Sequence, residues 1–197
     1  MPRNARILLR RVHLAVLHDR QLPSHFADRF SLRDPFFRLS HPLRNITQQR
    51  IPHDYAIVRV KMPEDAQRVS SFIASCYANV RPSAEAVRGW RAHPVYHPEL
   101  WMWILHVPTG SPTALAIAEF DSTISELSLE WIQVHPQHRR CGLGTHMITE
   151  LLSWGAEHAR IATVSGLAHS EAERFYRACG FQGSNLWWVL RADPDAP

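Results

Sequence analysis

The spacing of apolar and polar residues changes several times along this 197-residue chain. Residues 55–62 (YAIVRVKM) alternate and are rich in β-branched side chains, which predicts a strand. Residues 63–80 begin with Pro and two acids and then place apolar side chains at helical spacing, which predicts a helix. Ser83 suits the N-cap of a short second helix that ends near Trp90. The segment HPVYHP (93–98) is predicted to be a loop.

The rest of the chain alternates between the two spacings. Strands are predicted at 99–107, 113–121, 126–134, 161–167 and 185–192, and helices at 142–159 and 170–180, the last with Gly180 as its C-cap. The resulting order is β-α-α-β-β-β-α-β-α-β. It predicts a mixed α/β (α+β) domain in which a largely antiparallel central sheet is flanked by helices and includes one parallel crossover.

The first fifty residues differ from the rest in charge. They hold ten Arg and three acids, whereas residues 51–197 hold twelve Lys plus Arg and fifteen acids, so the net charge of +4 originates in the first quarter. Prolines and polar residues at 40–53 suggest a boundary. We therefore expect a basic N-terminal extension at 1–50, helical or partly disordered, a domain at 51–192 and a short tail at 193–197.

Within that extension, residues 5–20 (ARILLRRVHLAVLHDR) have several interpretations. A basic amphipathic helix here would bind a membrane surface or nucleic acid, or would resemble a transit peptide. Asp19, Asp28 and the scarcity of serine weaken the transit interpretation, and no nucleic-acid-binding motif occurs in the chain. An arm or helix packed on the domain is favoured, and neither a nucleic-acid nor a membrane partner is expected.

Composition restricts the class of protein further. With 45% hydrophobic and 20% charged residues the chain is typical of a globular protein, and no apolar run approaches the roughly 18 residues of a membrane span. The three cysteines lack metal-ligand spacing. Among the thirteen histidines, His93 and His97 flank prolines, and His135 and His138 lack companion acids or cysteines, so we expect no bound metal and no disulfide framework. A reducing cytoplasm fits this composition.

A basic, glycine-bearing corner (HRRCGLGT, 138–145) joins the strand at 126–134 to the helix at 142–159. A helix N-terminus directs free backbone N–H groups and the positive end of the helix dipole at one point, which favours an anion. Gly142 and Gly144 allow close approach or an unusual backbone, and Arg139 and Arg140 add charge that does not titrate. The corner matches neither a Walker A loop nor a dinucleotide fingerprint. A plain helix start with glycines for a tight turn is the alternative.

Two spaced motifs resemble those of the GCN5-related N-acetyltransferase (GNAT) superfamily. The run from Arg139 to Gly144 is similar to its acetyl-CoA signature [RQ]xxGx[GA], and HSEAERFYRACGF (169–181) is similar to its NxxAxxFYxxxGF segment. The resemblance covers about residues 55–192. It implies a sheet whose fourth and fifth strands, here 126–134 and 161–167, splay apart to admit acetyl-CoA.

The same resemblance implies where the donor would bind. The pyrophosphate would lie on the turn amides from Arg140 through Cys141, Gly142, Leu143 and Gly144 to Thr145. The pantetheine arm would pair like an added strand with the backbone of Ile132, Gln133 and Val134. His169 stands where the family commonly has Asn in contact with the cofactor arm, so that contact is in doubt, and His169 is also a candidate for proton transfer.

Direct attack on a thioester needs a neutral amine, a base to take its proton and an acid for the departing thiolate. Tyr176 matches the family's general acid; the alternative is a core aromatic residue beside Phe175, and the motif favours catalysis. Glu130, on one strand face with Glu126 and Ser128 by alternation, is a candidate base; a solvated strand residue is an equal alternative. A base acting through ordered water would leave no sequence signature.

The sequence gives the least information about the acceptor of the acetyl group. Trp90, Tyr96, Trp101 and Trp103 either line an aromatic acceptor pocket or fill the core, and the core interpretation is favoured for at least half of them. The predicted function is an acetyl-CoA-dependent N-acetyltransferase that acts on a primary amine of a small molecule or protein. The alternative is a non-catalytic acyl-CoA-binding regulatory module. Dimers are common among similar proteins, so a homodimer is an open expectation.

Overall fold

The computed structural model describes residues 14–22, 30, 32–77 and 79–191. These residues form two compact units, one of the described residues within 14–40 and 165–191 and one of those within 41–164. The second unit, called the donor unit below, holds the basic corner and the strand before it. The first, called the terminal unit, holds the second motif.

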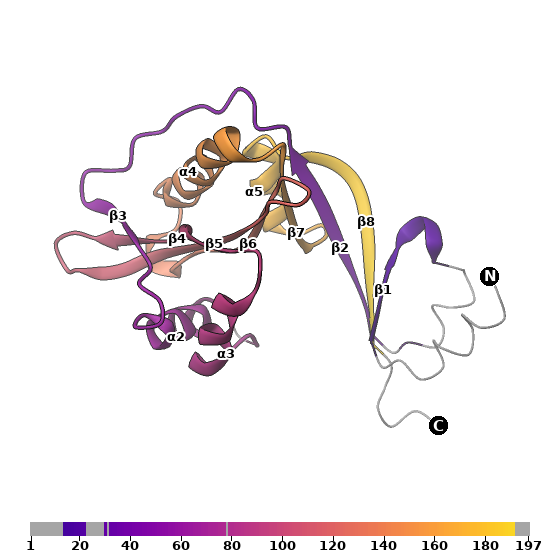
Figure 1. Cartoon of the computed structure of the whole chain (residues 1–197), viewed down its shortest axis with the longest axis horizontal. Coiled ribbons are helices and arrows are strands. Elements are labelled where there is room, and N and C mark those ends of the chain that lie inside the picture. The colour runs from indigo at the N-terminus through magenta and orange to yellow at the C-terminus, as the bar shows by residue number, and fades with distance from the viewer. Residues whose placement is uncertain (1–13, 23–29, 31, 78, 192–197) are drawn as a thin grey trace. The chain divides into compact units, whose positions relative to one another are not determined.

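The donor unit is built on a sheet of five strands (Figure 1). They are β3 (Tyr55–Arg59), β4 (Tyr96–His106), β5 (Ser111–Asp121), β6 (Glu126–Val134) and β7 (Ile161–Leu167), of which β7 continues into the terminal unit. Neighbours from β3 to β6 pair antiparallel, and β6 pairs parallel with β7. The predicted antiparallel meander and single parallel crossover are therefore confirmed.

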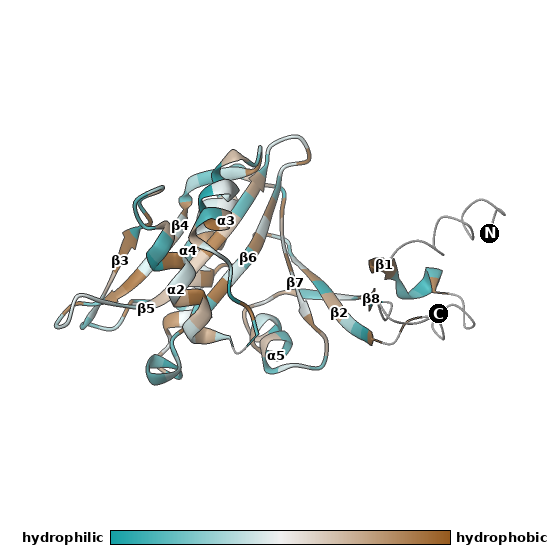
Figure 2. Ribbon diagram, turned by 90° about the horizontal axis from the view of Figure 1, so that it is seen from below, coloured by the Kyte–Doolittle hydropathy of each residue, from teal (hydrophilic) through white to brown (hydrophobic). Residues whose placement is uncertain are grey.

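Helices cover both faces of this sheet. α4 (Leu143–His158) lies on one face, and α2 (Ala66–Cys76) and α3 (Ala84–Gly89) lie on the other (Figure 1). On the α4 side, Gly155 is packed so closely against Leu127 that an added Cβ would come within 2.8 Å of the leucine side chain. On the α2 side, the ring of Phe72 meets that of Trp103 at 5.4 Å. Hydrophobic colouring follows the strands of this unit in Figure 2.

The predicted helices are confirmed within shorter bounds. Ser83 caps α3 by accepting a hydrogen bond from the Ala86 N–H at 3.1 Å. α2 begins three residues later than predicted, at Ala66, because the Asp65 carboxylate accepts the Lys61 N–H and holds the preceding residues in a turn. The predicted loop at 93–98 is partly wrong, because β4 already begins at Tyr96, which pairs with Glu119 across a bulge.

The terminal unit contains two strands that the sequence analysis did not predict. β1 (Leu14–His18) and β2 (Leu32–His41) both pair antiparallel with β8 (Gln182–Arg191), and α5 (Glu171–Ala178) belongs to the same unit. Residues 14–18 are thus a strand, whereas the interpretations of 5–20 from sequence were a basic amphipathic helix, or an arm or helix packed on the domain. Residues 5–13 lie outside the described residues. Pairing with β8 ties residues 32–41 to the last strand, so this stretch is part of a folded sheet rather than a separate arm.

Membrane-spanning character is absent from the described helices, none of which is both long and apolar enough to cross a bilayer. The described residues likewise contain no group of three or more His, Cys, Asp or Glu side chains that is suited to hold a metal ion.

Candidate functional site

The ladder between β6 and β7 ends before β6 does. Paired residues run from Glu126 opposite Ile161 to Leu129 opposite Val164, and β6 continues to Val134. The side of β6 from residue 130 to 134 that faces away from β5 therefore lies beyond the described ladder. This agrees with the predicted parting of the fourth and fifth strands of the domain.

A bulge in β6 stands at the point where this pairing ends. On the other side of β6, Leu129 pairs with Ala118 and Trp131 with Ile117, so Glu130 is an extra residue without an opposite partner. A bulge bends the strand and increases its local twist. The extra residue of β6 thus follows directly after Leu129, the last residue of β6 that pairs with β7.

The ladder with β5 decides which backbone groups of β6 point to the free side. The N–H of His135 donates to the carbonyl of Thr113 at 2.8 Å, in continuous register with residues 132–134. Because bonding residues alternate in an antiparallel ladder, the backbone of Gln133 points toward β5 and that of Ile132 and Val134 points away. Of the three residues predicted to bind the pantetheine arm, Ile132 and Val134 therefore direct their backbone groups away from β5, and the Val134 carbonyl already accepts from Arg139 Nε at 3.2 Å.

The corner after β6 has a strained backbone that leaves amides free. A short 3₁₀ turn, η4 (Pro136–His138), leads to Arg140 at φ 65° and Gly142 at φ 78°, both left-handed. The first α4 amide with an intrahelical acceptor is that of His146, which donates to the Gly142 carbonyl at 3.0 Å. The amides of Leu143, Gly144 and Thr145 therefore stand at an open helix N-terminus, and a positive φ before a helix is a conformation that forms anion-binding nests.

The structure also explains the two glycines and the arginine of the first motif. A Cβ on Gly142 would meet nothing within 4 Å, so its φ rather than crowding by the protein requires glycine. Gly144 lies inside the first turn of α4. Arg139 donates from Nε to the Val134 carbonyl at 3.2 Å, which holds its guanidinium at the end of the free edge. Cys141 is exposed and its thiol lies 3.5 Å from the Arg139 carbonyl oxygen.

Two acids, Glu119 and Glu130, and Ser128 lie beside the bulge where β6 pairs with β5. The Ser128 hydroxyl donates to Glu130 Oε1 at 2.6 Å, and Glu119 lies opposite Ser128 in the β5–β6 register. Burial raises the pKa of Glu119, and the charge of Glu130 raises it further while His93 opposes it. Sequence reasoning missed Glu119, because only the register across two strands brings it to Glu130. Glu126 is engaged elsewhere, accepting from the Thr163 hydroxyl at 2.6 Å.

In the terminal unit, Tyr176 lies near the end of α5 and is 7% exposed. Its ring contacts those of Phe37 and Phe181 at 6.1 and 5.7 Å. Gly180 at φ 92° donates to the Arg177 carbonyl, and Phe181 donates to the Tyr176 carbonyl, which together form a Schellman motif. The glycine and second phenylalanine of FYxxxGF thus end the helix, and Gly180 has the role that the sequence predicted.

His169 and Ser170 begin the same helix. Ser170 accepts from the Glu173 N–H at 3.2 Å, and the Glu173 carboxylate accepts the His169 N–H at 2.7 Å, an arrangement close to a capping box. Arg177 donates to Glu173 and lowers the pKa of that carboxyl, as does the His169 amide. His169 has φ 61°, a region in which Asn and His are both enriched, so the replacement is compatible with this backbone.

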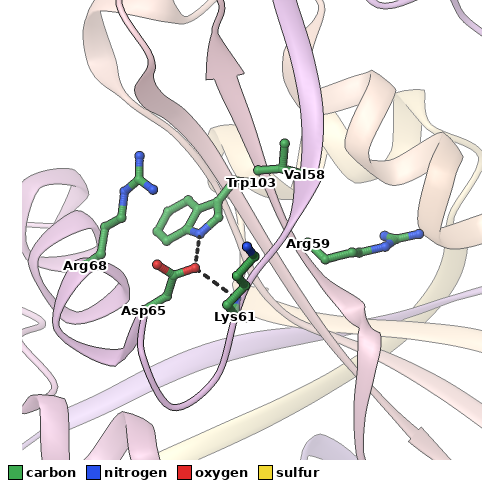
Figure 3. A pocket seen from close by; sticks show the side chains of 6 residues that line it. All are labelled: Val58, Arg59, Lys61, Asp65, Arg68 and Trp103. Carbon is green, nitrogen blue, oxygen red and sulfur yellow. Dashed lines mark hydrogen bonds between the residues drawn. The ribbon is translucent and has the colours of Figure 1, made fainter.

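A separate hollow of about 380 Å³ lies between β3, β4 and α2 (Figure 3). Its acid is already engaged, since the Asp65 carboxylate accepts from the Trp103 indole N–H at 3.3 Å and from the Lys61 amide at 2.9 Å. Arg68 lies over the Trp103 ring at 5.4 Å. The polar groups that face one another here therefore join α2 to the sheet edge.

Comparison with known proteins identifies the domain. Residues 103–183 match the model of the acetyltransferase (GNAT) domain family. No curated protein matches the sequence. Many solved structures share the fold.

Three of these structures illustrate the similarity. A GCN5-related N-acetyltransferase from Sphaerobacter thermophilus is 12% identical with a TM-score of 0.69, over 96% of this chain and 56% of its own. One from Kribbella flavida is 18% identical with a TM-score of 0.62, over 98% and 73%. A tandem GNAT protein from the clavulanic acid biosynthesis pathway is 17% identical with a TM-score of 0.65, over 98% and 69%.

The two motifs, the domain match and the shared fold agree. Residues 103–183 therefore form a GNAT domain, and the GCN5-related N-acetyltransferases named above share the fold of this chain. The chain spans 56% of the length of the Sphaerobacter protein. The domain match supports acyl transfer as the general class of reaction.

Proposed function

We propose that this protein transfers an acetyl group from acetyl-CoA to a primary amine by direct attack in a ternary complex. The observation that carries the proposal is the continuous path from the outward backbone edge of Ile132 and Val134, beyond the ladder with β7, to the free amides at the start of α4. An amide-bearing arm can add to such an edge as a strand, and a pyrophosphate suits such a helix N-terminus.

The donor would then be held in two parts. The pantetheine amides bond the outward N–H and carbonyl of Ile132 and the outward N–H of Val134, and the pyrophosphate accepts from amides between Arg140 and Thr145. The backbone of Gln133 faces β5, so Gln133 would hold β6 in the sheet and would not bond the pantetheine arm through its backbone. Arg139, already bonded to the Val134 carbonyl, neutralises phosphate charge where the two parts meet.

The reaction itself needs one proton acceptor and one proton donor. The amine nitrogen attacks the thioester carbonyl carbon, the C–S bond breaks, the amine proton passes to a base and the CoA thiolate takes a proton from an acid. Glu130 is the proposed base because it follows the last paired residue of β6 and its carboxylate is held by Ser128. The family resemblance assigns the acid to Tyr176, and His169 is a second candidate for proton transfer.

The test measures free CoA released from acetyl-CoA with a panel of primary amines. For Tyr176→Phe we expect kcat to fall by about a hundredfold, the scale of one lost general acid. Tyr55→Phe is the matched control, because it also removes one hydroxyl, here from a 3.0 Å hydrogen bond to His138 in the donor unit. Its kcat should stay within about twofold of the wild-type value.

Two results separate catalysis from simple binding. If acetyl-CoA raises the melting temperature but no amine or protein acceptor yields CoA, the protein is a non-catalytic acyl-CoA-binding module. If acetyl-CoA neither raises the melting temperature nor binds in calorimetry, the donor assignment itself is wrong.

A further inference from the structure

We infer that the acceptor is an amine with a flat hydrophobic group close to its amino group and no carboxylate beside it. Half-buried aromatic rings next to Glu119 and Glu130 would select it. The inference deepens the proposed function and rests on it for the position of the amine. It concerns only the α2 and α3 side of the donor unit.

An aromatic cluster covers this side of β6 at the bulge. The rings of Trp131 and Trp90 are stacked, with centroids 5.6 Å apart and planes 15° apart. Tyr77 meets Trp131 edge-on at 6.3 Å, and Trp101 meets both Trp90 and Tyr96 edge-on at 6.1 and 5.3 Å. The β4–β5–β6 register places Trp101 and Trp131 on opposite sides of Ile117, so these rings project from one face of the sheet.

The cluster has a buried floor and an accessible rim. Trp101 is 1% exposed and Trp103 is fully buried, so these two of the four predicted aromatic residues belong to the core. Trp90, Tyr96 and Trp131 are only half-buried. Core packing therefore explains Trp101 and Trp103. The half-buried rings of Trp90, Tyr96 and Trp131, called the aromatic rim, are partly accessible to a ligand.

Two buried polar side chains on the same face have no partner within the described part of the chain. The indole N–H of Trp101 makes no hydrogen bond, and neither does the amide nitrogen or oxygen of Gln133, which is 6% exposed. Buried polar groups in folded proteins are nearly always bonded, so each such group needs an explanation. Bound substrate, or water that accompanies it, would supply these partners.

The charged residues beside the half-buried rings determine which substituents the acceptor amine can have next to its amino group. The charge of Glu130 raises the pKa of Glu119, and the Ser128 hydroxyl donates a hydrogen bond to Glu130. His93 is the basic group that acts on Glu119, and Arg139 acts on Tyr77 from the donor side. A protonated amine is therefore attracted to the two acids, whereas a carboxylate next to the amine would be repelled by them. A flat ring beside the amine would meet the aromatic rim, where ring contacts and cation–π attraction both act.

The test compares the binding of three amines to the full chain saturated with CoA, by calorimetry. 2-Phenylethylamine has the ring and the amine, phenylalanine adds a carboxylate, and butylamine lacks the ring. We expect 2-phenylethylamine to bind about tenfold tighter than either, because each missing or repulsive contact is worth about one factor of ten. Equal or tighter binding of phenylalanine overturns the inference, as does equal binding of butylamine.

Variants identify the residues that select the ligand. Trp90→Leu should weaken 2-phenylethylamine about five- to tenfold, while Trp90→Phe, which keeps a ring, should retain most of the affinity. Trp154→Leu is the matched control, since Trp154 lies on α4 across the sheet and stacks on His158. Should Trp90→Leu fail to fold, Glu119→Gln tests the charge instead, and we expect it to narrow the preference for 2-phenylethylamine over phenylalanine. Unchanged selectivity in Glu119→Gln and unchanged affinity in Trp90→Leu would both count against the inference.

Binding and turnover distinguish this inference from the proposed function. Selective binding of 2-phenylethylamine without CoA release supports the inference and refutes the acetyltransferase. Acetylation of other amines, without preference for a ring or against a carboxylate, supports the enzyme and refutes the inference.

Discussion

Leu129 and Val164 form the last residue pair of the parallel ladder between β6 and β7, and the bulged residue Glu130 follows directly. This one pair marks the end of an ordinary sheet and the start of a free edge. The free edge leads to the open N-terminus of α4. The backbone groups that would bind the pantetheine arm and the amides that would bind the phosphates of a CoA donor therefore both follow the bulge in the chain.

Deletion of Glu130 tests the role of the bulge. Leu129 faces α4 and Trp131 faces the aromatic cluster, so removal of the extra residue restores alternation without turning its neighbours. We expect a folded protein in which β6 and β7 pair further and acetyl-CoA affinity falls at least about tenfold. Calorimetry measures the affinity and amide hydrogen exchange measures the added pairing. Glu130→Gln is the control, because it keeps the bulge and should retain donor affinity.

Gly142→Ala and Gly110→Ala form a matched pair. Both glycines are left-handed, with φ 78° and 65°, and a Cβ on either meets nothing within 4 Å. Each alanine should cost about 1–2 kcal/mol of folding stability, because only the backbone conformation is strained. Acetyl-CoA affinity should fall in Gly142→Ala alone, since Gly110 lies in the turn between β4 and β5. An equal loss of affinity in both variants would contradict the assigned role of the corner.

The acid pair predicts a pH dependence of stability. The pKa of Glu119 is raised in the folded protein, so in the pH range above its ordinary value the folded state binds more protons than the unfolded state. Stability contributed by this group therefore falls as pH rises through that range. We expect Glu119→Gln to raise the melting temperature at pH 7 relative to wild type and to lose that advantage near pH 4. Glu157→Gln, an exposed acid on α4, should change neither value.

The start of α5 gives a test in the terminal unit. Glu173→Ala removes the acceptor of the His169 amide and the partner of Arg177, and we expect it to destabilise the fold by about 1 kcal/mol, the usual value of a lost cap. Because interactions with Arg177 and His169 lower the pKa of Glu173, its contribution is present at neutral pH and is lost as pH falls through the lowered value. The difference between the two proteins in thermal melts should vanish in acid. Glu171→Ala, whose ion pair with Arg174 is loose and exposed, is the control.

Local patterns explain which elements the sequence predicted well. The strands at 126–134 and 161–167 were predicted with the bounds that the structure has, because each is a short β-rich run between turn residues. Ser83 and Gly180 marked helix ends, because their roles depend only on neighbours in the chain. The corner from Arg139 to Thr145 was recognisable for the same reason, since its glycines and charges lie in one short segment.

The sequence by itself therefore determined the order of elements from residue 55 onward, the cap residues Ser83 and Gly180, and a glycine-bearing corner that resembles the GNAT signature. Tertiary structure alone decided that β1 and β2 pair with the last strand, that Glu130 is a bulge, and that Glu119 lies opposite Ser128. The physical reason is distance along the chain. Helical and strand periodicity, caps and turns are set by residues a few positions apart, whereas pairing partners, registers and bulges depend on contacts between strands that no local pattern records.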